Sequence, residues 1–438
     1  MRKVCHSFPT RFLALFLTLF LLLACRPPDS AQPTTVTFAY FGDPAEQAAF
    51  ISVVEGFHAT SPQNDGVPIR IETIAVPSQS DYLTRLTTDF AAGAPPDVSL
   101  FNYRRMTQYY NRGALEVLDG RAQESTVLDL GGFYPAALDA FRNSAGEVVC
   151  LPQNISSQVV YYNKALFDAA GLAYPAPGWS WQAFRQTALA LTLPDTNGDG
   201  EADQHGLGLE PQLIRMAPFI WQNGGELVDN PAAPTRLALD APIAQEAIRF
   251  VADLALVDQV VPSRNAEAVQ SHRDRFYTGK IAMYIDSRRI VPSLRELAQF
   301  DWDVAPLPTG KQAANVLHSD GYCLAAASKV KDAAWAFIEY ALSAEGQTRA
   351  AQLGRTVPSL RSVAESSAFL DPTQPPASAQ VWLDIAPELR ALPKLENWVT
   401  IERVAAIELE QLYLGAQTLE ATIGNIQAAS LDGFVPIK

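Results

Sequence analysis

From residue 35 onward, short apolar segments alternate with amphipathic segments, and this alternation limits the fold more than any other feature. The apolar segments TVTFAYFG, VPIRIETIAV and PDVSLFN are predicted strands, and the segments at residues 44–60, 80–93 and 106–118 are predicted helices. Strands that alternate with helices of this length form a mostly parallel sheet covered by helices on both faces. We therefore expect an α/β fold.

The length and the later pattern of the chain predict two lobes. With 438 residues, the chain is well above the size of one typical domain. After residue 172 the pattern changes to Trp-containing helices and turns, and the earlier pattern returns in GYCLAAASKVKDAAWAFIEYALS, residues 321–343. A chain that leaves one domain and comes back is typical of two lobes joined by a hinge.

The N-terminal segment is predicted to be an export signal. Cationic residues precede an apolar run at residues 12–24, which is shorter than the roughly 20 residues that span a membrane. The run ends in LLAC, which resembles a bacterial lipobox; the alternative is an ordinary signal in which the cysteine stands by chance. We expect residues 1–24 to be a lipoprotein signal peptide, Cys25 to carry lipid, and residues 25–35 to be a tether to the membrane.

The charge balance argues against nucleic acid as a partner. The sequence has 33 Lys and Arg against 47 Asp and Glu, with a net charge of −14, and loss of the leader removes only cations. Such a surface repels phosphate backbones.

Two cysteines remain after the leader and the lipid site are set aside. Cys150 and Cys323 each lie in a short apolar run, EVVCLP and GYCLAAAS. In an oxidising compartment they are expected either to pair as a disulfide or to be separate buried thiols. Neither has a metal-ligand spacing.

The segment DTNGDGEADQHG spaces oxygen-bearing side chains as a calcium loop does. Candidate ligands are Asp195, Asn197, Asp199, Glu201 through its carbonyl, and Asp203, but Gly206 stands where an EF-hand needs a bidentate Glu. A second helix is also not expected after it. We predict a structural loop, either holding calcium or closed by its own Asx turns, and no cofactor for function.

In a parallel sheet, ligands bind beyond the carboxyl ends of the strands. The segments expected there are YFGD, PSQSD and FNYRR, at residues 40–43, 77–81 and 101–105. No phosphate-binding glycine motif follows these strands, so nucleotide binding has no support.

Taken in order, several segments resemble one family over nearly the whole mature chain. They include AAGAPPDVSLF, VVYYNKALFDAAGL, PGWSWQAFRQTALALT, WQNGGELVD, FYTGKIAMYIDS and WDVAPLPTG. The family is the extracytoplasmic solute-binding proteins of ABC importers, in the sugar-binding cluster that includes maltose-binding proteins (family 1). The resemblance implies a periplasmic-binding-protein-like fold of type II, a monomer that delivers carbohydrate to ABC permease subunits, and an extracytoplasmic, lipid-anchored location. It also implies a first lobe at residues 36–152 and 319–352, a second at 153–318 and 353–438, and crossing strands near 151–156 and 319–324.

The resemblance also predicts a set of ligand-binding residues, because a sugar needs aromatic platforms and polar side chains that bind hydroxyls. At the position after AMYI, where relatives commonly have an aromatic, this chain has Ser287 and Arg288; the arginine is expected to bind an anionic group or vicinal hydroxyls, or to be a solvated charge together with Arg289. Trp398 falls where maltose-type relatives place a stacking tryptophan; the alternative is a core tryptophan of a long helix. The predicted set is Tyr40, Phe41, Asp43, Phe101, Asn102, Tyr103, Gln153, Asn154, Ser156, Trp221, Asn223, Ser287, Arg288 and Trp398.

Two other functions compete with a sugar receptor. The same fold binding an anionic solute, such as a glycerophosphodiester or a sugar acid, would use arginines in the cleft. A secreted glycosidase would also have aromatics and paired carboxylates in a cleft, but no HExxH, GxSxG or CxxC motif points to an enzyme. We therefore expect a binding protein that is not an enzyme.

Overall fold

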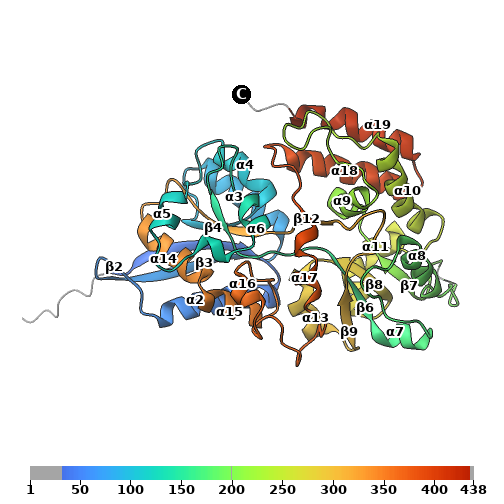
Figure 1. Cartoon of the computed structure of the whole chain (residues 1–438), viewed down its shortest axis with the longest axis horizontal. Coiled ribbons are helices and arrows are strands. Elements are labelled where there is room, and N and C mark those ends of the chain that lie inside the picture. Colours follow the sequence, from blue (N-terminus) through green and yellow to red (C-terminus); the bar gives the residue numbers. More distant parts are fainter. Residues whose placement is uncertain (1–31, 199, 435–438) are drawn as a thin grey trace, which may run out of the picture.

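The computed structural model describes residues 32–198 and 200–434, which form two lobes lying side by side (Figure 1). The predicted signal peptide, Cys25 and most of the tether lie outside the described residues, as does Asp199. None of the described helices is both long enough and apolar enough to cross a bilayer.

The first lobe is built on a six-stranded sheet with the order β2-β3-β1-β4-β11-β5. Strand β1 is parallel to β3 and to β4, whereas β11 is antiparallel to β4 and to β5. The bounds are β1 Thr34–Phe41, β2 Gln63–Asn64, β3 Val67–Val76, β4 Val98–Asn102, β5 Cys150–Pro152 and β11 Asp320–Leu324. The chain therefore returns to this sheet after building the second lobe, as the sequence predicts.

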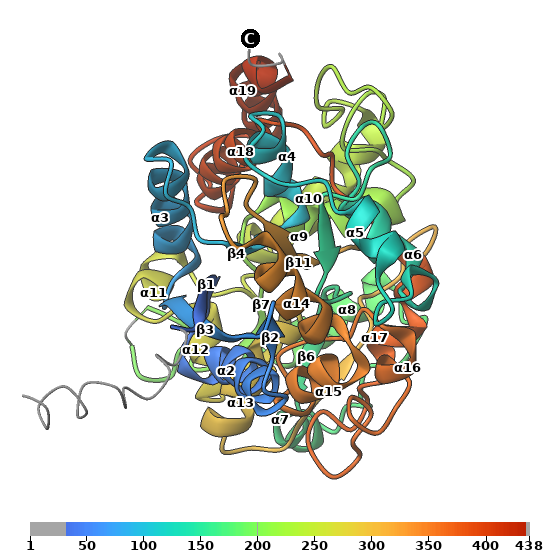
Figure 2. The ribbon, with the colours of Figure 1, turned by 90° about the vertical axis from the view of Figure 1, so that its left-hand side faces the viewer.

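Helices cover both faces of this sheet, with α3 on one side and α2 on the other (Figure 1 and Figure 2). Helix α2 starts where Asp43 and Glu46 form a capping box, with Pro44 in its first turn. Its buried Phe50, Val53 and Phe57 recur every three or four residues and pack on the sheet. The helices of this lobe are α2 Pro44–Ala59, α3 Gln79–Ala91, α4 Tyr103–Tyr110, α5 Asp119–Glu124, α6 Pro135–Ala140, α14 Lys331–Leu342, α15 Ala344–Gln352 and α16 Arg361–Ala364.

The second lobe has a four-stranded sheet with the order β7-β8-β6-β9. Its bounds are β6 Val159–Asn163, β7 His205–Gly208, β8 Ile281–Asp286 and β9 Trp302–Ala305. Its helices are α7 Lys164–Ala169, α8 Trp181–Ala190, α9 Leu213–Gln222, α10 Pro242–Leu256, α11 Arg264–Val269, α12 His272–Tyr277, α13 Val291–Leu297, α17 Val381–Asp384, α18 Trp398–Tyr413 and α19 Leu419–Ser430. The helices α18 and α19 lie together with α9 and α10 at one end of the lobe (Figure 1).

The second sheet corrects the prediction of a mostly parallel sheet in each lobe. Only β7 and β8 are parallel, whereas β6 is antiparallel to both β8 and β9. Strand β6 brings the chain into this lobe and β9 carries it back toward the hinge, so the two run in opposite directions. This correction does not change the prediction of an α/β fold with two lobes.

Three segments cross between the lobes. The backbone nitrogen of Gln153 donates to the carbonyl of Asp320 at 2.8 Å, and that of Ile155 donates to the carbonyl of Val357 at 2.9 Å. The first two segments correspond to the predicted crossings. The third is an addition: it runs past residue 357 and α16, which lie against the first lobe, to α17 of the second lobe. Between the lobes, β10 Asn315–Val316 pairs with β12 Leu389–Arg390.

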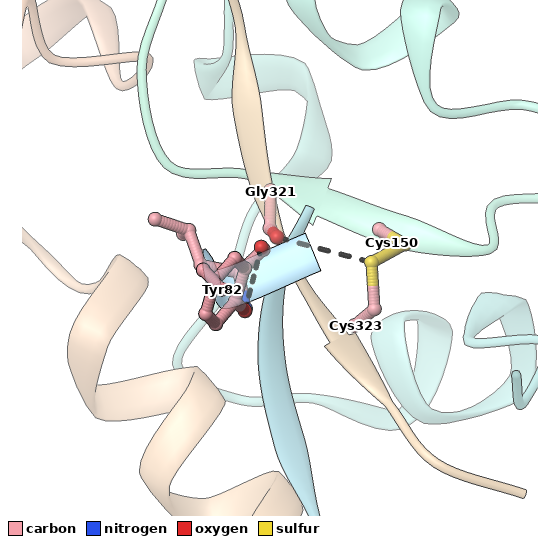
Figure 3. Close-up of a disulfide and its surroundings, with 5 residues drawn as sticks. Tyr82, Cys150, Gly321 and Cys323 are labelled. Atoms are coloured by element: carbon pink, nitrogen blue, oxygen red, sulfur yellow. Dashed lines mark hydrogen bonds between the residues drawn. A yellow bond between two sulfur atoms is a disulfide. The ribbon is translucent and has the colours of Figure 1, made fainter. Parts of the chain in front are cut away.

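A disulfide joins Cys150 on β5 to Cys323 on β11, two strands that lie next to each other (Figure 3). Both cysteines are fully buried in the first lobe. The bond closes a sequence separation of 173 residues. Because that span contains most of the second lobe, the disulfide fastens the outgoing and returning segments of the chain to each other.

Candidate functional site

A cavity of about 260 Å³ lies between the lobes, lined by residues of both lobes and of the crossing segments. The first lobe contributes the carboxyl ends of β1 and β4 and the start of α3, where a ligand is expected in a parallel sheet. The second lobe contributes β8 and α9. Its lining residues are Phe41, Gln79, Asn102, Arg104, Asn154, Ser156, Glu210, Gln212, Ile214, Arg215, Arg273, Asp286, Ser287, Arg289, His318, Asp320 and Arg355.

A larger cavity of about 680 Å³ lies near the loop at residues 195–203. It is lined by residues of the second lobe alone, among them His205, His272 and Glu267. A movement of one lobe against the other would leave this cavity unchanged, whereas it would open or close the smaller one. We assign the functional site to the smaller cavity, which we call the cleft, because it also lies at the carboxyl ends of β1 and β4 and is lined by the crossing segments.

A buried ionic network forms the second-lobe wall of the cleft. Asp286 is 2% exposed and accepts from Arg215 Nη2 at 3.1 Å, Tyr284 Oη at 3.0 Å and its neighbour's backbone nitrogen at 2.7 Å. Arg273 lies 3.5 Å from the same carboxylate, and Glu210 lies 3.3 Å from Arg215. Burial raises the pKa of Asp286, but Arg215 and Arg273 lower it more, so its pKa lies well below the usual range.

Polar groups of the first lobe and the hinge form the opposite wall. Asn102 ends β4, caps α4 through its side-chain oxygen, and donates from Nδ2 to Asp320 at 3.1 Å. Asn154 accepts from the backbone nitrogen of Asp320 at 2.7 Å. Arg104 pairs with Glu402 of α18, which joins the first lobe to the second. Burial, together with Arg215 and Arg104, lowers the pKa of His318, so its ring is neutral at pH 7.

Five of the predicted ligand-binding residues line the cleft: Phe41, Asn102, Asn154, Ser156 and Ser287. They lie at strand ends or on a crossing segment, where the topology of the sheet and the hinge places side chains toward the gap between lobes. The structure brings these predicted residues together, and their role in binding remains a prediction.

The other predicted residues lie outside the cleft wall. Trp398 is 0% exposed at the start of α18, and Trp221 is covered by the Arg390 guanidinium at 4.6 Å from its ring. Asn223 donates to the carbonyl of Ile243 at 2.7 Å. Four more predicted residues are buried and do not line the cleft: Tyr40, Phe101, Tyr103 and Gln153.

Of the two neighbouring arginines, Arg289 lines the cleft and Arg288 does not. The Arg288 guanidinium packs against the rings of Phe369 and Trp382, with its carbon 4.7 Å from each ring centre, and its Nε donates to the carbonyl of Gly354 at 2.9 Å. Burial lowers its pKa to about 9. Arg288 was expected to contact the ligand, but its guanidinium instead packs against Phe369 and Trp382.

Asp43 has a role at the contact between the lobes. Its side chain caps α2 and accepts from Ser293 Oγ of α13 at 2.6 Å. Nearby, Glu46 lies 3.1 Å from Arg289. These contacts hold the two lobes against each other beside the cleft.

The loop at residues 195–203 is closed by its own side chains over its described part. Asp195 accepts from the backbone nitrogens of Asn197, Gly198 and Gly200 at 2.6–3.1 Å, which is an Asx-turn arrangement. Asp203 accepts from Thr196 and Asn197. Within residues 32–198 and 200–434, no group of three or more His, Cys, Asp or Glu is arranged to hold a metal ion. This leaves out Asp199, so the calcium prediction remains untested.

Most of the charged groups of the cleft were missed by reasoning from the sequence. Arg215, Arg273 and Arg355 lie on helices or loops without a motif. Glu210 follows β7 and Asp320 begins β11, and neither stands in a motif that marks it as functional. Only two pairs of arginines were pointed out by the local sequence: the pair in FNYRR, at the end of a predicted strand, and the pair that follows Ser287. The residues meet because three separate segments of the chain converge at the hinge, which spacing in the sequence does not reveal.

Comparisons with known proteins agree with this architecture. The model of the family described as bacterial extracellular solute-binding protein matches residues 42–348. A putative binding protein of Brucella abortus is 24% identical over 391 residues, covering 86% of this chain and 88% of the relative. The sn-glycerol-3-phosphate-binding periplasmic protein UgpB of Escherichia coli is 24% identical over 68% of this chain and 66% of its own.

Among solved structures, the ABC substrate-binding protein Lmo0181 of Listeria monocytogenes, in complex with cycloalternan, superposes with a TM-score of 0.80. It is 24% identical and covers 91% of this chain and 98% of its own. The fold is therefore shared. Because the family model spans well over half of the sequence, the chain belongs to the bacterial extracellular solute-binding proteins.

Proposed function

We propose that the protein is the receptor of an ABC importer, which captures a carbohydrate in the cleft and presents it to a membrane permease. The observation that carries the proposal is the cleft itself, since both lobes and the hinge line one polar cavity. A ligand that contacts both walls favours the closed arrangement of the lobes. The permease can then distinguish the closed, ligand-bound protein from the ligand-free protein.

The chemistry of the cleft suits a polyhydroxylated solute. Asn102, Asn154, Gln212, Ser156 and Ser287 offer donors and acceptors of hydrogen bonds. The volume of about 260 Å³ is near the lower end for ligand pockets, so a small sugar fits better than a long oligosaccharide. We infer that the protein acts as an extracytoplasmic monomer and performs no catalysis.

An anionic solute such as a glycerophosphodiester is the second candidate. The similarity to a glycerol-3-phosphate-binding protein and the arginines of the cleft favour it. The carboxylates of Glu210, Asp286 and Asp320 line the same cavity, and they would repel a ligand that is mostly negative charge. These carboxylates favour a ligand with a hydroxylated body.

A thermal-shift screen of the lipid-free protein tests the proposal. The panel contains monosaccharides, disaccharides, sugar acids and glycerophosphodiesters. A ligand that binds only the folded protein, at about 100 times its dissociation constant, adds about 2.7 kcal/mol to the free energy of unfolding. We expect a raised melting temperature with at least one small carbohydrate, and a panel without any shift would contradict the proposal.

Lipid anchoring at Cys25 is proposed from the lipobox-like sequence alone. Replacing Cys25 with Ser removes the thiol to which lipid would be attached, so the variant is expected to leave the membrane fraction or to stop maturing. Cell fractionation followed by mass spectrometry measures this. A Cys25→Ser protein that remains acylated would rule out the anchor.

A calcium ion in the loop at residues 195–203 is likewise proposed from the spacing of its oxygens. Metal bound only to the folded state raises stability by mass action, so chelation is expected to lower the melting temperature. Because the loop lies away from the cleft residues, ligand affinity should stay unchanged. An unchanged melting temperature in EDTA would show that the loop is closed by its own hydrogen bonds alone.

A further inference from the structure

One arginine in the cleft, Arg355, is buried without a partner. Its side chain is 1% exposed and it lines the cavity between the lobes. Its Nε and Nη2 atoms are buried and have no hydrogen-bond partner in the described part of the chain. No carboxylate there lies within ion-pair distance of it. A guanidinium has five N–H donors and stays charged, so this cation lacks its usual compensation.

The surrounding structure holds Arg355 in place. The preceding Gly354 has a φ of +83° and ends α15, and its carbonyl accepts from Arg288. Two residues later, the carbonyl of Val357 accepts from the crossing segment. The rings of Phe50 and Phe41 lie 5.2 Å and 6.0 Å from the guanidinium carbon. The aromatic rings stabilise the cation partly, while the forked donors remain unused.

The other arginines of the cleft show what Arg355 lacks. Arg104 pairs with Glu402, Arg215 and Arg273 pair with Asp286, and Arg289 pairs with Glu46. Burying a charge without a partner is strongly unfavourable. A residue that keeps such a charge at a binding cleft is well suited to receive an anion from outside, because the ligand then completes the missing pair.

A second side chain, that of Asp320, limits how much negative charge the ligand can carry. Asp320 lines the same cavity and accepts from Asn102, and none of the described cations lies within ion-pair distance of its carboxylate. A carboxylate at this position accepts from hydroxyls and repels further negative charge. The cleft therefore combines one cation that can bind an anionic group, Arg355, with a carboxylate that can bind hydroxyl groups, Asp320.

Resting on the proposed function, we propose that the ligand is a small sugar or polyol that carries one anionic group, a carboxylate or a phosphate ester. Arg355 binds that group through its unused donors, in the bidentate manner that guanidinium favours. Asp320 and Asn102 bind hydroxyls of the neutral body. No bond is made or broken in this interaction.

Calorimetric titration with matched ligand pairs tests the proposal. The pairs are glucose with glucuronate, glucose with glucose 6-phosphate, and glycerol with glycerol 3-phosphate. We expect one anionic member to bind at least about 100-fold more tightly than its neutral partner, because the neutral ligand leaves Arg355 unpaired. The carboxylate and phosphate pairs distinguish the two sources of charge.

Arg355→Gln removes the charge and keeps a polar side chain of similar reach. Its affinity for the preferred anion should fall at least about 100-fold, while its melting temperature without ligand should not fall, because an unpaired buried charge is lost. Arg349→Gln is the matched control, since Arg349 pairs with Glu345 on the surface of α15; it should leave affinity unchanged.

Several results would overturn the proposal. Wild type that binds a neutral sugar as tightly as its charged partner contradicts it and leaves the receptor function standing. A lowered melting temperature of Arg355→Gln with unchanged affinity would assign the arginine a structural role. Wild type that binds no member of the sugar panel contradicts the proposed function itself. Because the comparison of ligand pairs uses wild type, it holds even if the variant does not fold.

Discussion

Replacing both Cys150 and Cys323 with alanine is expected to lower the free energy of unfolding by about 3–5 kcal/mol. The disulfide joins residues separated by 173 positions, and closing so long a loop restricts the unfolded chain strongly. The bond is also fully buried between β5 and β11. Urea unfolding of wild type and of the double variant measures the difference, with the denatured, unreduced wild type assayed for free thiols.

The reduced wild type is the matched control for this prediction. It keeps both sulfur atoms and lacks only the bond, so the difference between it and the double alanine variant reports the packing of the two sulfurs. Two free thiols in the denatured, unreduced lipid-free protein, or a double variant as stable as wild type, would contradict the predicted role of the disulfide.

Asp286→Ala is expected to destabilise the protein by about 3–5 kcal/mol, since it leaves buried arginines without their carboxylate. Arg215 and Arg273 both pair with Asp286. Asp301 is exposed and forms no ion pair with an arginine in the described part of the chain. Asp301→Ala is therefore the matched control and should change stability by less than about 0.5 kcal/mol.

The pH dependence gives an independent measurement of the same network. The pKa of Asp286 in the folded protein lies below the ordinary value of 3.8. Its contribution to stability is therefore present above about pH 4 and is lost as the pH falls below that value. Wild type should lose stability more steeply than Asp286→Ala in this range. Equal slopes, together with equal stability at pH 7, would contradict the role assigned to the network.

The first lobe could be predicted from the sequence because local signals and tertiary structure agree there. The apolar segments that become β1 and β4 are mostly buried, β3 alternates buried and exposed residues over much of its length, and α2 begins at a capping box formed by residues close together in the sequence. The sheet of the second lobe was predicted less well. Its antiparallel pairings depend on where β6 and β9 enter and leave the lobe, and no local pattern specifies that.

Prediction from the sequence meets the same limit for the single residues of the cleft. Asn102 could be found because it ends a predicted strand of a parallel sheet. Trp398 resembles a stacking tryptophan by its position along the chain, yet the start of α18 turns it into the core. Arg355 gave no signal, because its lack of a partner is visible only when the three crossing segments are assembled.

A calorimetric titration of the lipid-free protein with small neutral and acidic sugars tests the central claim most directly. The account predicts saturable binding of at least one sugar, with one site per chain, and recovery of the sugar unchanged afterwards. Absence of binding throughout the panel, or hydrolysis of the sugar that binds, would contradict the assignment of the cleft as the site of a carbohydrate receptor.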